Sequence, residues 1–179
     1  MNKEVIGLDL SLTSTGVAVG DSQYTISSKL SGVERLDEIS RSVAAFVSGI
    51  SEPAVVLEGY SFGSRNSQSH SIGELGGVVK LTLWRIGVPM VIVPPTARAK
   101  FATGRGNASK SEVVSAVSAR TGIVWSGKGA DDKCDAWLLQ EIGLWYFGRP
   151  RFEWPKAHID GLEKIDFGPF GAGTEDSSE

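Results

Sequence analysis

One stretch near the N-terminus, EVIGLDLSLTSTGVAVG over residues 4–20, constrains the fold more than any other. Its first apolar run, VIGL, is typical of a buried central strand, and Asp9 follows that run directly. A polar turn and a second apolar run, VAV, then predict a hairpin of two antiparallel strands. Because an unpaired carboxylate is costly to bury, we expect Asp9 either to have a strong partner such as a metal ion or to form a turn at the strand end.

Length and composition narrow the class of protein. A chain of 179 residues is enough for one domain and a tail. The single cysteine, Cys134, excludes an internal disulfide framework and a multi-cysteine zinc site, which is typical of a reducing compartment. No apolar run approaches the roughly 20 residues of a membrane span, and the N-terminus has no signal-peptide pattern. We therefore expect a cytoplasmic protein with no membrane partner.

The net charge of −3 argues mildly against a nucleic-acid-binding protein, but the charge is unevenly distributed along the chain. Residues 160–179 hold six acidic residues and one basic residue, so residues 1–159 carry a net charge of +2. Carboxylates that bind metal ions would be neutralised as well. The surface formed by the first 159 residues is therefore more positive than the total implies.

A second strand that ends in an acid follows along the chain. A third strand is predicted at about residues 23–28 and a helix at about 32–50, with Ser31 as its N-cap. The apolar run AVVL then leads directly into Glu58. Two acid-terminated strands joined through a helix predict a crossover connection, which makes these strands parallel neighbours and lets Asp9 and Glu58 converge.

The remaining periodicity predicts a strand at residues 88–93 and helices at about residues 72–86, 96–102, 109–120 and 131–147. The sequence thus predicts an α/β fold with a five-stranded mixed sheet, an antiparallel three-strand meander plus two parallel strands, flanked by helices. We expect residues 1–148 to form one domain. Residues 149–179, which are rich in Pro and Gly, are predicted to form a C-terminal tail that is partly extended or disordered.

The last predicted helix carries acidic residues at its start. Asp131 is suited to capping the helix, whereas Asp132 and Asp135 are three residues apart and project from one helical face. Together with the two strand-end acids they make four carboxylates from three distant places. Such a set can hold two Mg²⁺ or Mn²⁺ ions about 3.5–4 Å apart, the arrangement that hydrolyses phosphodiesters.

A basic, glycine-containing segment precedes the last two helices. Arg98, Lys100, Arg105 and Lys110 lie within thirteen residues, and a helix begins near Ser109. Positive side chains, glycine backbone and a helix N-terminus together favour phosphate binding, although the spacing matches neither a P-loop nor a dinucleotide fingerprint. A solvated charged surface is the alternative interpretation.

Three glycines, Gly73, Gly76 and Gly77, lie in the first turns of a predicted helix. Each glycine costs a helix about 1 kcal/mol relative to alanine, so the cluster needs a structural reason. Close approach of a second copy in a twofold dimer is one reason, and tight packing on the protein's own sheet is the other.

At this point the chain resembles the RuvC family of Holliday-junction resolvases, which have the ribonuclease H-like fold. The matching stretches are GLDLSLTSTGVAV, VVLEGYSF, VPMVIVPPTARAKFATGRGNASKSEVV and DDKCDAWLL, which span roughly residues 5–147. The Ser/Thr-rich turn after Asp9 and the short length are most similar to phage-encoded members, for which the compartment is the cytoplasm of the bacterial host.

The resemblance implies a homodimeric endonuclease that cuts four-way DNA junctions by paired symmetric hydrolysis with two Mg²⁺ or Mn²⁺ ions per active site. It assigns the metal-binding and catalytic acids to Asp9, Glu58, Asp132 and Asp135, with Lys110 at the scissile phosphate. It further implies a dimer contact at Gly73, Gly76 and Gly77. The DNA-binding residues expected from the resemblance and the basic segment are Tyr60, Phe62, Arg65, Arg98, Lys100, Arg105 and Lys110.

Two features depart from the family pattern. Bacterial members place an aromatic residue three positions after the Glu, whereas this chain has Ser61 there, between Tyr60 and Phe62. Nothing in the sequence specifies a branch-migration motor as partner. The alternative function is a broader branched-DNA nuclease acting on forks, flaps and replication intermediates. A nucleotide-dependent phosphotransferase normally needs about twice this length, so we expect no nucleotide cofactor.

Overall fold

The computed structural model describes residues 3–60 and 67–171. Five strands form one mixed sheet in the order β3-β2-β1-β4-β5. β1 pairs antiparallel with β2, and β2 antiparallel with β3, while β1–β4 and β4–β5 are parallel. This arrangement confirms the predicted three-strand meander with two parallel strands added. The strands are β1 (Glu4–Asp9), β2 (Thr15–Val19), β3 (Ser22–Ile26), β4 (Pro53–Glu58) and β5 (Met90–Val93).

The helices agree with the predicted segments except at some ends. The longest difference is at α2, which begins five residues before the predicted start, because a Ser- and Gln-containing first turn resembles a loop in sequence. No helix in residues 3–60 and 67–171 is long and apolar enough to span a membrane. The helices are α1 (Gly32–Ser48), α2 (Ser67–Arg85), α3 (Pro95–Thr103), α4 (Lys110–Thr121), α5 (Ala130–Tyr146) and α6 (Lys156–Ile159).

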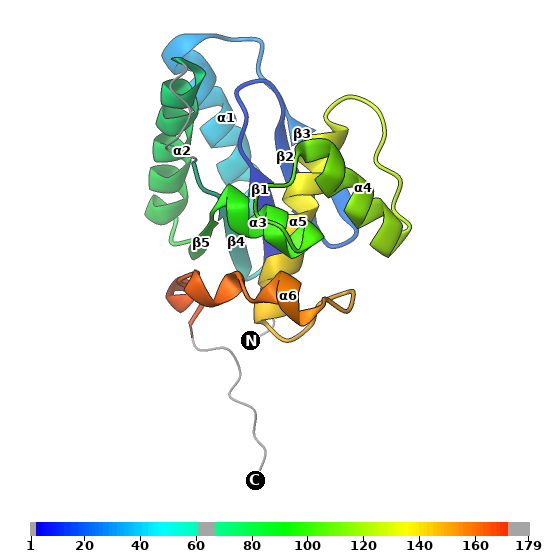
Figure 1. Cartoon of the computed structure of the whole chain (residues 1–179). Coiled ribbons are helices and arrows are strands. Elements are labelled where there is room, and N and C mark those ends of the chain that lie inside the picture. Colours follow the sequence, from blue (N-terminus) through cyan, green and yellow to red (C-terminus); the bar gives the residue numbers. More distant parts are fainter. Residues whose placement is uncertain (1–2, 61–66, 172–179) are drawn as a thin grey trace.

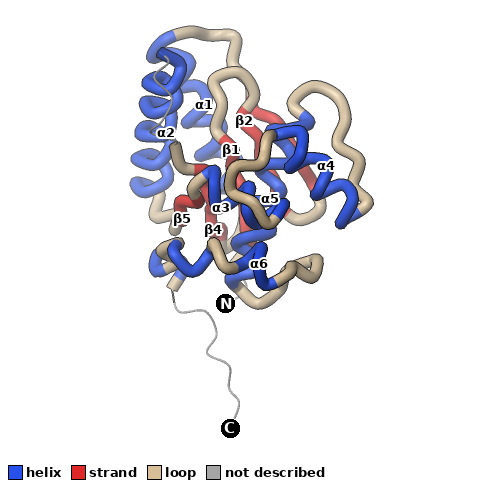
Figure 2. The backbone as a smooth tube through the Cα atoms, viewed as in Figure 1, coloured by secondary structure: helices blue, strands red, loops and turns tan. Residues whose placement is uncertain are grey.

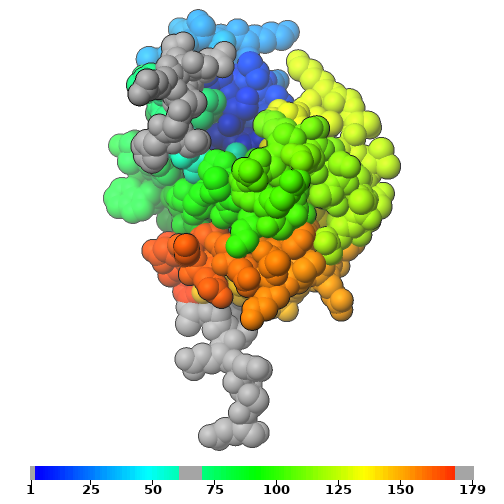
Figure 3. Space-filling view, in the orientation of Figure 1, coloured from blue at the N-terminus to red at the C-terminus, as the bar shows by residue number. Residues whose placement is uncertain are grey.

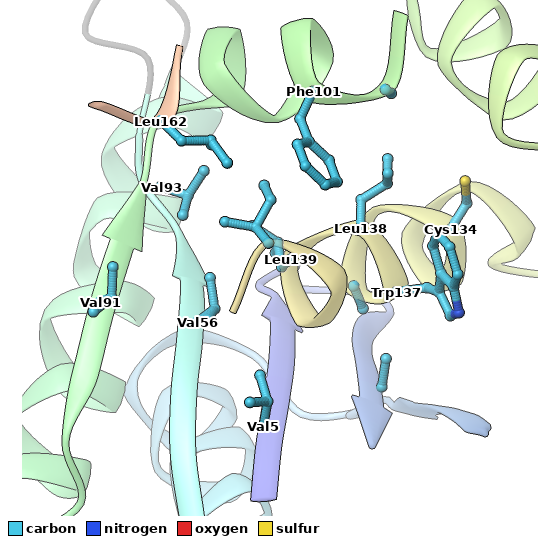
Figure 4. Close-up of a cluster of buried hydrophobic side chains, with 14 of the residues drawn as sticks. Val5, Val56, Val91, Val93, Phe101, Cys134, Trp137, Leu138, Leu139 and Leu162 are labelled. Atoms are coloured by element: carbon cyan, nitrogen blue, oxygen red, sulfur yellow. The ribbon is translucent and has the colours of Figure 1, made fainter. Parts of the chain in front are cut away.

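The helices cover both faces of the sheet, with α1 and α2 on one face and α3 and α5 on the other (Figures 1 and 2). Because strand side chains alternate between faces, each strand contributes to two cores. Ile6 and Leu8 of β1 pack with α1 and α2, whereas Val5 packs with α5. In the α5 core, Trp137, Leu138 and Leu139 lie between the strands and α3 (Figure 4).

Helix α5 approaches the sheet closely because glycines face it. A Cβ atom added to Gly7 of β1 would lie 1.9 Å from the Ala136 carbonyl oxygen of α5. At Gly16 of β2 the added atom would lie 2.2 Å from the Asp132 carbonyl oxygen. Both contacts are with backbone, so a side chain at either position would force α5 away. The glycines therefore fix the distance between α5 and β1.

The C-terminal segment differs from the predicted tail. Residues 149–171 contain α6 and two short 3₁₀ turns, Leu162–Lys164 and Gly168–Phe170, and they pack along one end of the molecule, where Figure 3 shows them in orange. Leu162 and Phe170 are buried in the α5 core. The segment folds onto the body because its hydrophobic side chains can be buried there and because it can hydrogen-bond to Glu141, a buried acceptor in α5. Residues 172–179 lie outside the described part.

Glu141 of α5 is the anchor for this segment. Its carboxylate is fully buried and accepts hydrogen bonds from the backbone and side-chain Nε of Arg151, both within 2.9 Å. The backbone N–H of Phe152 and the indole N–H of Trp154 also donate to it. A buried charge is stable when it is fully hydrogen-bonded and paired, which is the case here.

Candidate active site

Asp9 and Glu58 lie side by side at the ends of two neighbouring parallel strands. The register pairs Leu8 of β1 with Leu57 of β4, so the acids occupy the next position on each strand. Alternation places Asp9 on the same face as Val5 and Gly7, which is the face that α5 covers. Strand pairing and side-chain alternation together therefore direct both carboxylates toward α5.

The first turns of α5 supply the other two acids. Asp132 and Asp135 lie three residues apart on the helix, and Gly16 brings the backbone of Asp132 against β2. Asp135 is only 1% exposed, and Cys134 beside it is also buried. The structure thus gathers Asp9, Glu58, Asp132 and Asp135, which are distant in sequence, into one cluster around the ends of β1 and β4.

Arg98 of α3 contacts the same cluster from the interior of the protein. Its Nε lies 2.5 Å from Glu58 Oε1, and its Nη1 donates to Asp135 Oδ1. The residue is 6% exposed. The prediction that Arg98 contacts DNA at the surface is therefore not met in this structure, because the guanidinium is buried and paired with two carboxylates.

Lys110, the first residue of α4, lies on the solvent side of the cluster. Its Nζ is 3.3 Å from Asp131 Oδ2, 3.8 Å from Asp132 Oδ1 and 3.9 Å from Asp135 Oδ2. Its side chain is 61% exposed. Partial burial lowers the pKa of Lys110, but the neighbouring carboxylates outweigh it and raise the pKa, so the ammonium stays charged. Lys110 is thus an exposed cation at the mouth of the site.

Burial and repulsion from neighbouring acids disfavour ionisation of Asp9, Asp132 and Asp135. Burial raises the pKa of Asp9 well above its usual value, and the nearby Glu58 and Asp135 raise it further. Burial likewise raises the pKa of Asp135 to about 7, although the Arg98 guanidinium opposes the shift. Burial also raises the pKa of Asp132. The negative charges of such a cluster are energetically unfavourable in the folded protein, and a bound divalent cation would neutralise them.

Ser14, in the turn between β1 and β2, is a site residue that the sequence reading did not identify. It is buried, and the proximity of its side chain to the Asp132 carboxylate lowers the pKa of Asp132, which partly offsets the effect of burial. The Ser/Thr-rich turn after Asp9 was the available signal, but nothing in the sequence distinguishes Ser14 from its neighbours Ser11, Thr13 and Thr15.

The chemistry of the cluster fits a hard divalent cation, because all four candidate ligands are carboxylates. Asp135 Oδ2 is buried and has no hydrogen-bond partner among the described residues, so it is available as a ligand. Across residues 3–60 and 67–171, no three His, Cys, Asp or Glu side chains form a preassembled coordination sphere.

The remaining predicted site residues lie in several environments. Lys100 packs its aliphatic stem beside Gly161, whereas Arg105 is exposed and pairs with Glu112. Tyr60 is half-buried, and its hydroxyl occupies the space left by Gly76. The contact with Tyr60 therefore explains why position 76 is a glycine without a second copy of the chain. Phe62 and Arg65 lie outside the described residues.

The other two glycines of α2 have no close neighbour in the described part of the chain. Within residues 3–60 and 67–171, nothing other than the backbone of α2 and the adjacent residues lies within 4 Å of a Cβ atom added to Gly73 or Gly77. Leu81 and Trp84 continue the same helical face and are 46% and 71% exposed. We call Gly73, Gly77, Leu81 and Trp84 the α2 stripe.

No family model matches the sequence. Among curated proteins, the chain is 31% identical over 113 residues to crossover junction endodeoxyribonuclease RuvC of Synechococcus sp. (strain WH7803), a match that covers 63% of this chain and 71% of the relative. It is 29% identical over 112 residues to the protein of the same name from Prochlorococcus marinus (strain NATL1A), with the same coverage of both chains.

Among solved structures, the fold is similar to that of Thermus thermophilus RuvC, with a TM-score of 0.63, 20% identity and coverage of 85% of this chain and 99% of that one. A structure of T. thermophilus RuvC in complex with a Holliday junction substrate matches with a TM-score of 0.62 and 22% identity, over 77% of this chain and 92% of that one. These neighbours confirm the predicted ribonuclease H-like fold. By sequence and by fold, this chain belongs to the RuvC family of crossover junction endodeoxyribonucleases.

Proposed function

We infer that the protein is an endonuclease that resolves four-way DNA junctions by hydrolysing phosphodiester bonds, as the name of its relatives states. The observation that carries this conclusion is the cluster of four carboxylates from β1, β4 and α5 in a chain of this family. The single buried cysteine is compatible with the cytoplasm, the compartment that we propose for the enzyme.

Members of this family depend on divalent metal ions, and we propose two Mg²⁺ or Mn²⁺ ions per active site. Asp9, Glu58 and Asp135 would hold these ions, and Asp132 would bind an ion or orient the attacking water. Bound ions of this kind activate water and stabilise the leaving oxygen of a phosphodiester. The unpartnered Asp135 Oδ2 and the raised pKa values of the acids support this assignment.

DNA would approach the open side of the cluster, where Lys110 lies. The position of Lys110 at the mouth supports a contact with the scissile phosphate, and the exposed Arg105 supports a contact with the DNA backbone nearby. Tyr60 follows Glu58 by two residues and remains a candidate for contact at the junction, as do Phe62 and Arg65. Phosphate contacts of this kind give most of the affinity and make it dependent on salt.

We propose that two copies pair through the α2 stripe. Small residues at one end of the stripe allow close helix approach, and Leu81 and Trp84 offer apolar area that is otherwise exposed. A twofold dimer would present two active sites to one junction, which paired symmetric cutting requires.

Trp84→Glu should convert the dimer into a monomer. The charge would be buried without a partner at the interface, whereas the monomer should fold normally because Trp84 is 71% exposed. Sedimentation equilibrium measures the oligomeric state. Val124→Glu, which changes a comparably exposed apolar residue outside α2, should remain dimeric. If Trp84→Glu is still a dimer, the stripe is not the interface.

Substrate choice tests the proposed function directly. We expect paired nicks in labelled four-way junctions with Mg²⁺ or Mn²⁺, and at least about tenfold slower cutting of three-way junctions and flaps of the same sequence. The measurement is the rate of strand cleavage on each substrate with wild-type protein. Equal rates on all three would favour the broader branched-DNA nuclease, and no cleavage of any would contradict both functions.

A further inference from the structure

We propose that Arg98 is a positioning residue that holds one oxygen of Glu58 and one of Asp135 from inside the protein, so that the second oxygen of each carboxylate is left for a divalent cation arriving from the Lys110 side. This inference rests on the proposed function, because it concerns how the same acids bind metal.

The first support is how firmly Arg98 is held. It lies on α3 next to Ala99, and the nearby Phe101 and Ala102 are buried in the α5 core. The planar guanidinium presents several donors in a fixed fork, so Nε and Nη1 can bond two carboxylates that come from different elements, β4 and α5. Burial of α3 therefore fixes the angle from which both carboxylates are held.

The second support is the division of the carboxylate oxygens. Arg98 uses Asp135 Oδ1, while Asp135 Oδ2 has no hydrogen-bond partner among the described residues and lies 3.9 Å from Lys110 Nζ. The two oxygens of one carboxylate thus face two different cations. Arg98 is buried on one side, and Lys110 is 61% exposed on the other.

The two cations consequently have different roles. The three contacts of Lys110 are between 3.3 and 3.9 Å long, and its own side chain is 61% exposed, so an entering metal ion can replace it at little cost. The contacts of Arg98 are short and buried, so it would remain in place and continue to orient the acids. Outer groups that orient metal-binding carboxylates typically contribute about 10- to 100-fold to metal affinity.

Metal affinity distinguishes positioning from simple charge. Removing either Arg98 or Lys110 deletes one positive charge beside the cation site, and Coulomb's law alone predicts tighter metal binding in both cases. If Arg98 positions the carboxylates, its removal should instead weaken metal binding, whereas removal of Lys110 should not. The pair Arg98→Met and Lys110→Met is therefore a matched comparison with opposite expected signs.

The experiment is a calorimetric titration of each full-length protein with Mn²⁺ in the absence of DNA. We expect Arg98→Met to bind Mn²⁺ at least about 10-fold more weakly than wild type, and Lys110→Met to bind equally or more tightly. Arg41→Met, which removes an exposed arginine of α1, should bind as wild type.

Arg98→Lys is the control for a possible loss of the fold in Arg98→Met. Lysine keeps the positive charge, but its single ammonium cannot span both carboxylates, so this variant should remain folded by circular dichroism and still bind Mn²⁺ about 10-fold more weakly. Wild-type or tighter binding by folded Arg98→Lys or Arg98→Met would overturn the positioning role. If wild-type protein binds no Mn²⁺, the proposed metal site itself fails, and the inference with it.

Discussion

Asp9→Asn should bind four-way junctions and cut them at least about 1,000-fold more slowly than wild type. Asp9 lies near Glu58 and Asp135 at the end of the central strand, where it would help to hold the metal ions. An amide is a poor ligand for a hard cation, and each lost 1.36 kcal/mol of transition-state stabilisation costs a factor of ten. The contacts that hold DNA come from other residues, so binding should persist.

The same variant should be at least as stable as wild type without metal. Burial and the neighbouring acids raise the pKa of Asp9, which means that its ionised form is unfavourable in the folded chain. Asparagine keeps the shape and removes that charge. Cleavage rate, junction affinity by gel shift in EDTA and melting temperature are the three measurements.

Asp21→Asn is the matched control, since it makes the same change at an exposed turn and should behave as wild type in all three measurements. Near-normal cutting by Asp9→Asn would remove Asp9 from the mechanism.

Gly7→Ala should destabilise the protein by about 3 kcal/mol or more and lower its melting temperature by about 10 °C. The new methyl group would lie 1.9 Å from the Ala136 carbonyl oxygen and 2.5 Å from the Gln140 nitrogen, both backbone atoms of α5. The helix must therefore move away from β1, and it would carry Asp132 and Asp135 with it. Junction cleavage should fall together with stability.

Gly49→Ala provides the comparison for this prediction. Gly49 has a φ of −79°, which any residue adopts, and an added Cβ would have its nearest contact at 3.4 Å. Thermal unfolding followed by circular dichroism should show a small change for Gly49→Ala and a large decrease for Gly7→Ala. A melting temperature for Gly7→Ala within about 2 °C of wild type would show that α5 does not need this close approach.

The fold could be predicted from sequence where local pattern and chain order agree. The apolar runs ending in Asp9 and Glu58 define two strands, and the intervening helix makes them parallel, so their proximity follows from connectivity alone. Asp132 and Asp135 follow from helical spacing. For these elements no long-range information was needed beyond the order of the elements.

The surroundings of other predicted site residues depend on packing between distant elements, which local pattern does not reveal. Arg98 and Lys100 are two positions apart in a basic segment, yet α3 turns one toward the acids and the other toward Gly161. Only the placement of α3 on the sheet decides which side is buried. Gly76 similarly accommodates Tyr60 of another element.

The packing of the C-terminal segment could not be predicted for a related reason. Its turns have no period, but Glu141 is an acid in the mostly apolar run from Ala136 to Trp145 of α5, and a buried acid requires partners. Those partners, Arg151 and Trp154, begin only ten residues later. From the sequence, Glu141 indicates that a buried acid needs hydrogen-bond partners, but it does not indicate which residues these are.

Helix α5 supplies two of the acids with its first turns and the centre of a hydrophobic core with the residues that follow, from Trp137 to Ile142. A ribosome-bound chain that has not yet released this helix has β1 and β4 but neither Asp132 nor Asp135, and it also lacks the apolar cover for that face of the sheet. The cluster of four acids is therefore complete only once α5 has been synthesised, and the same helix completes the apolar cover of that face of the sheet.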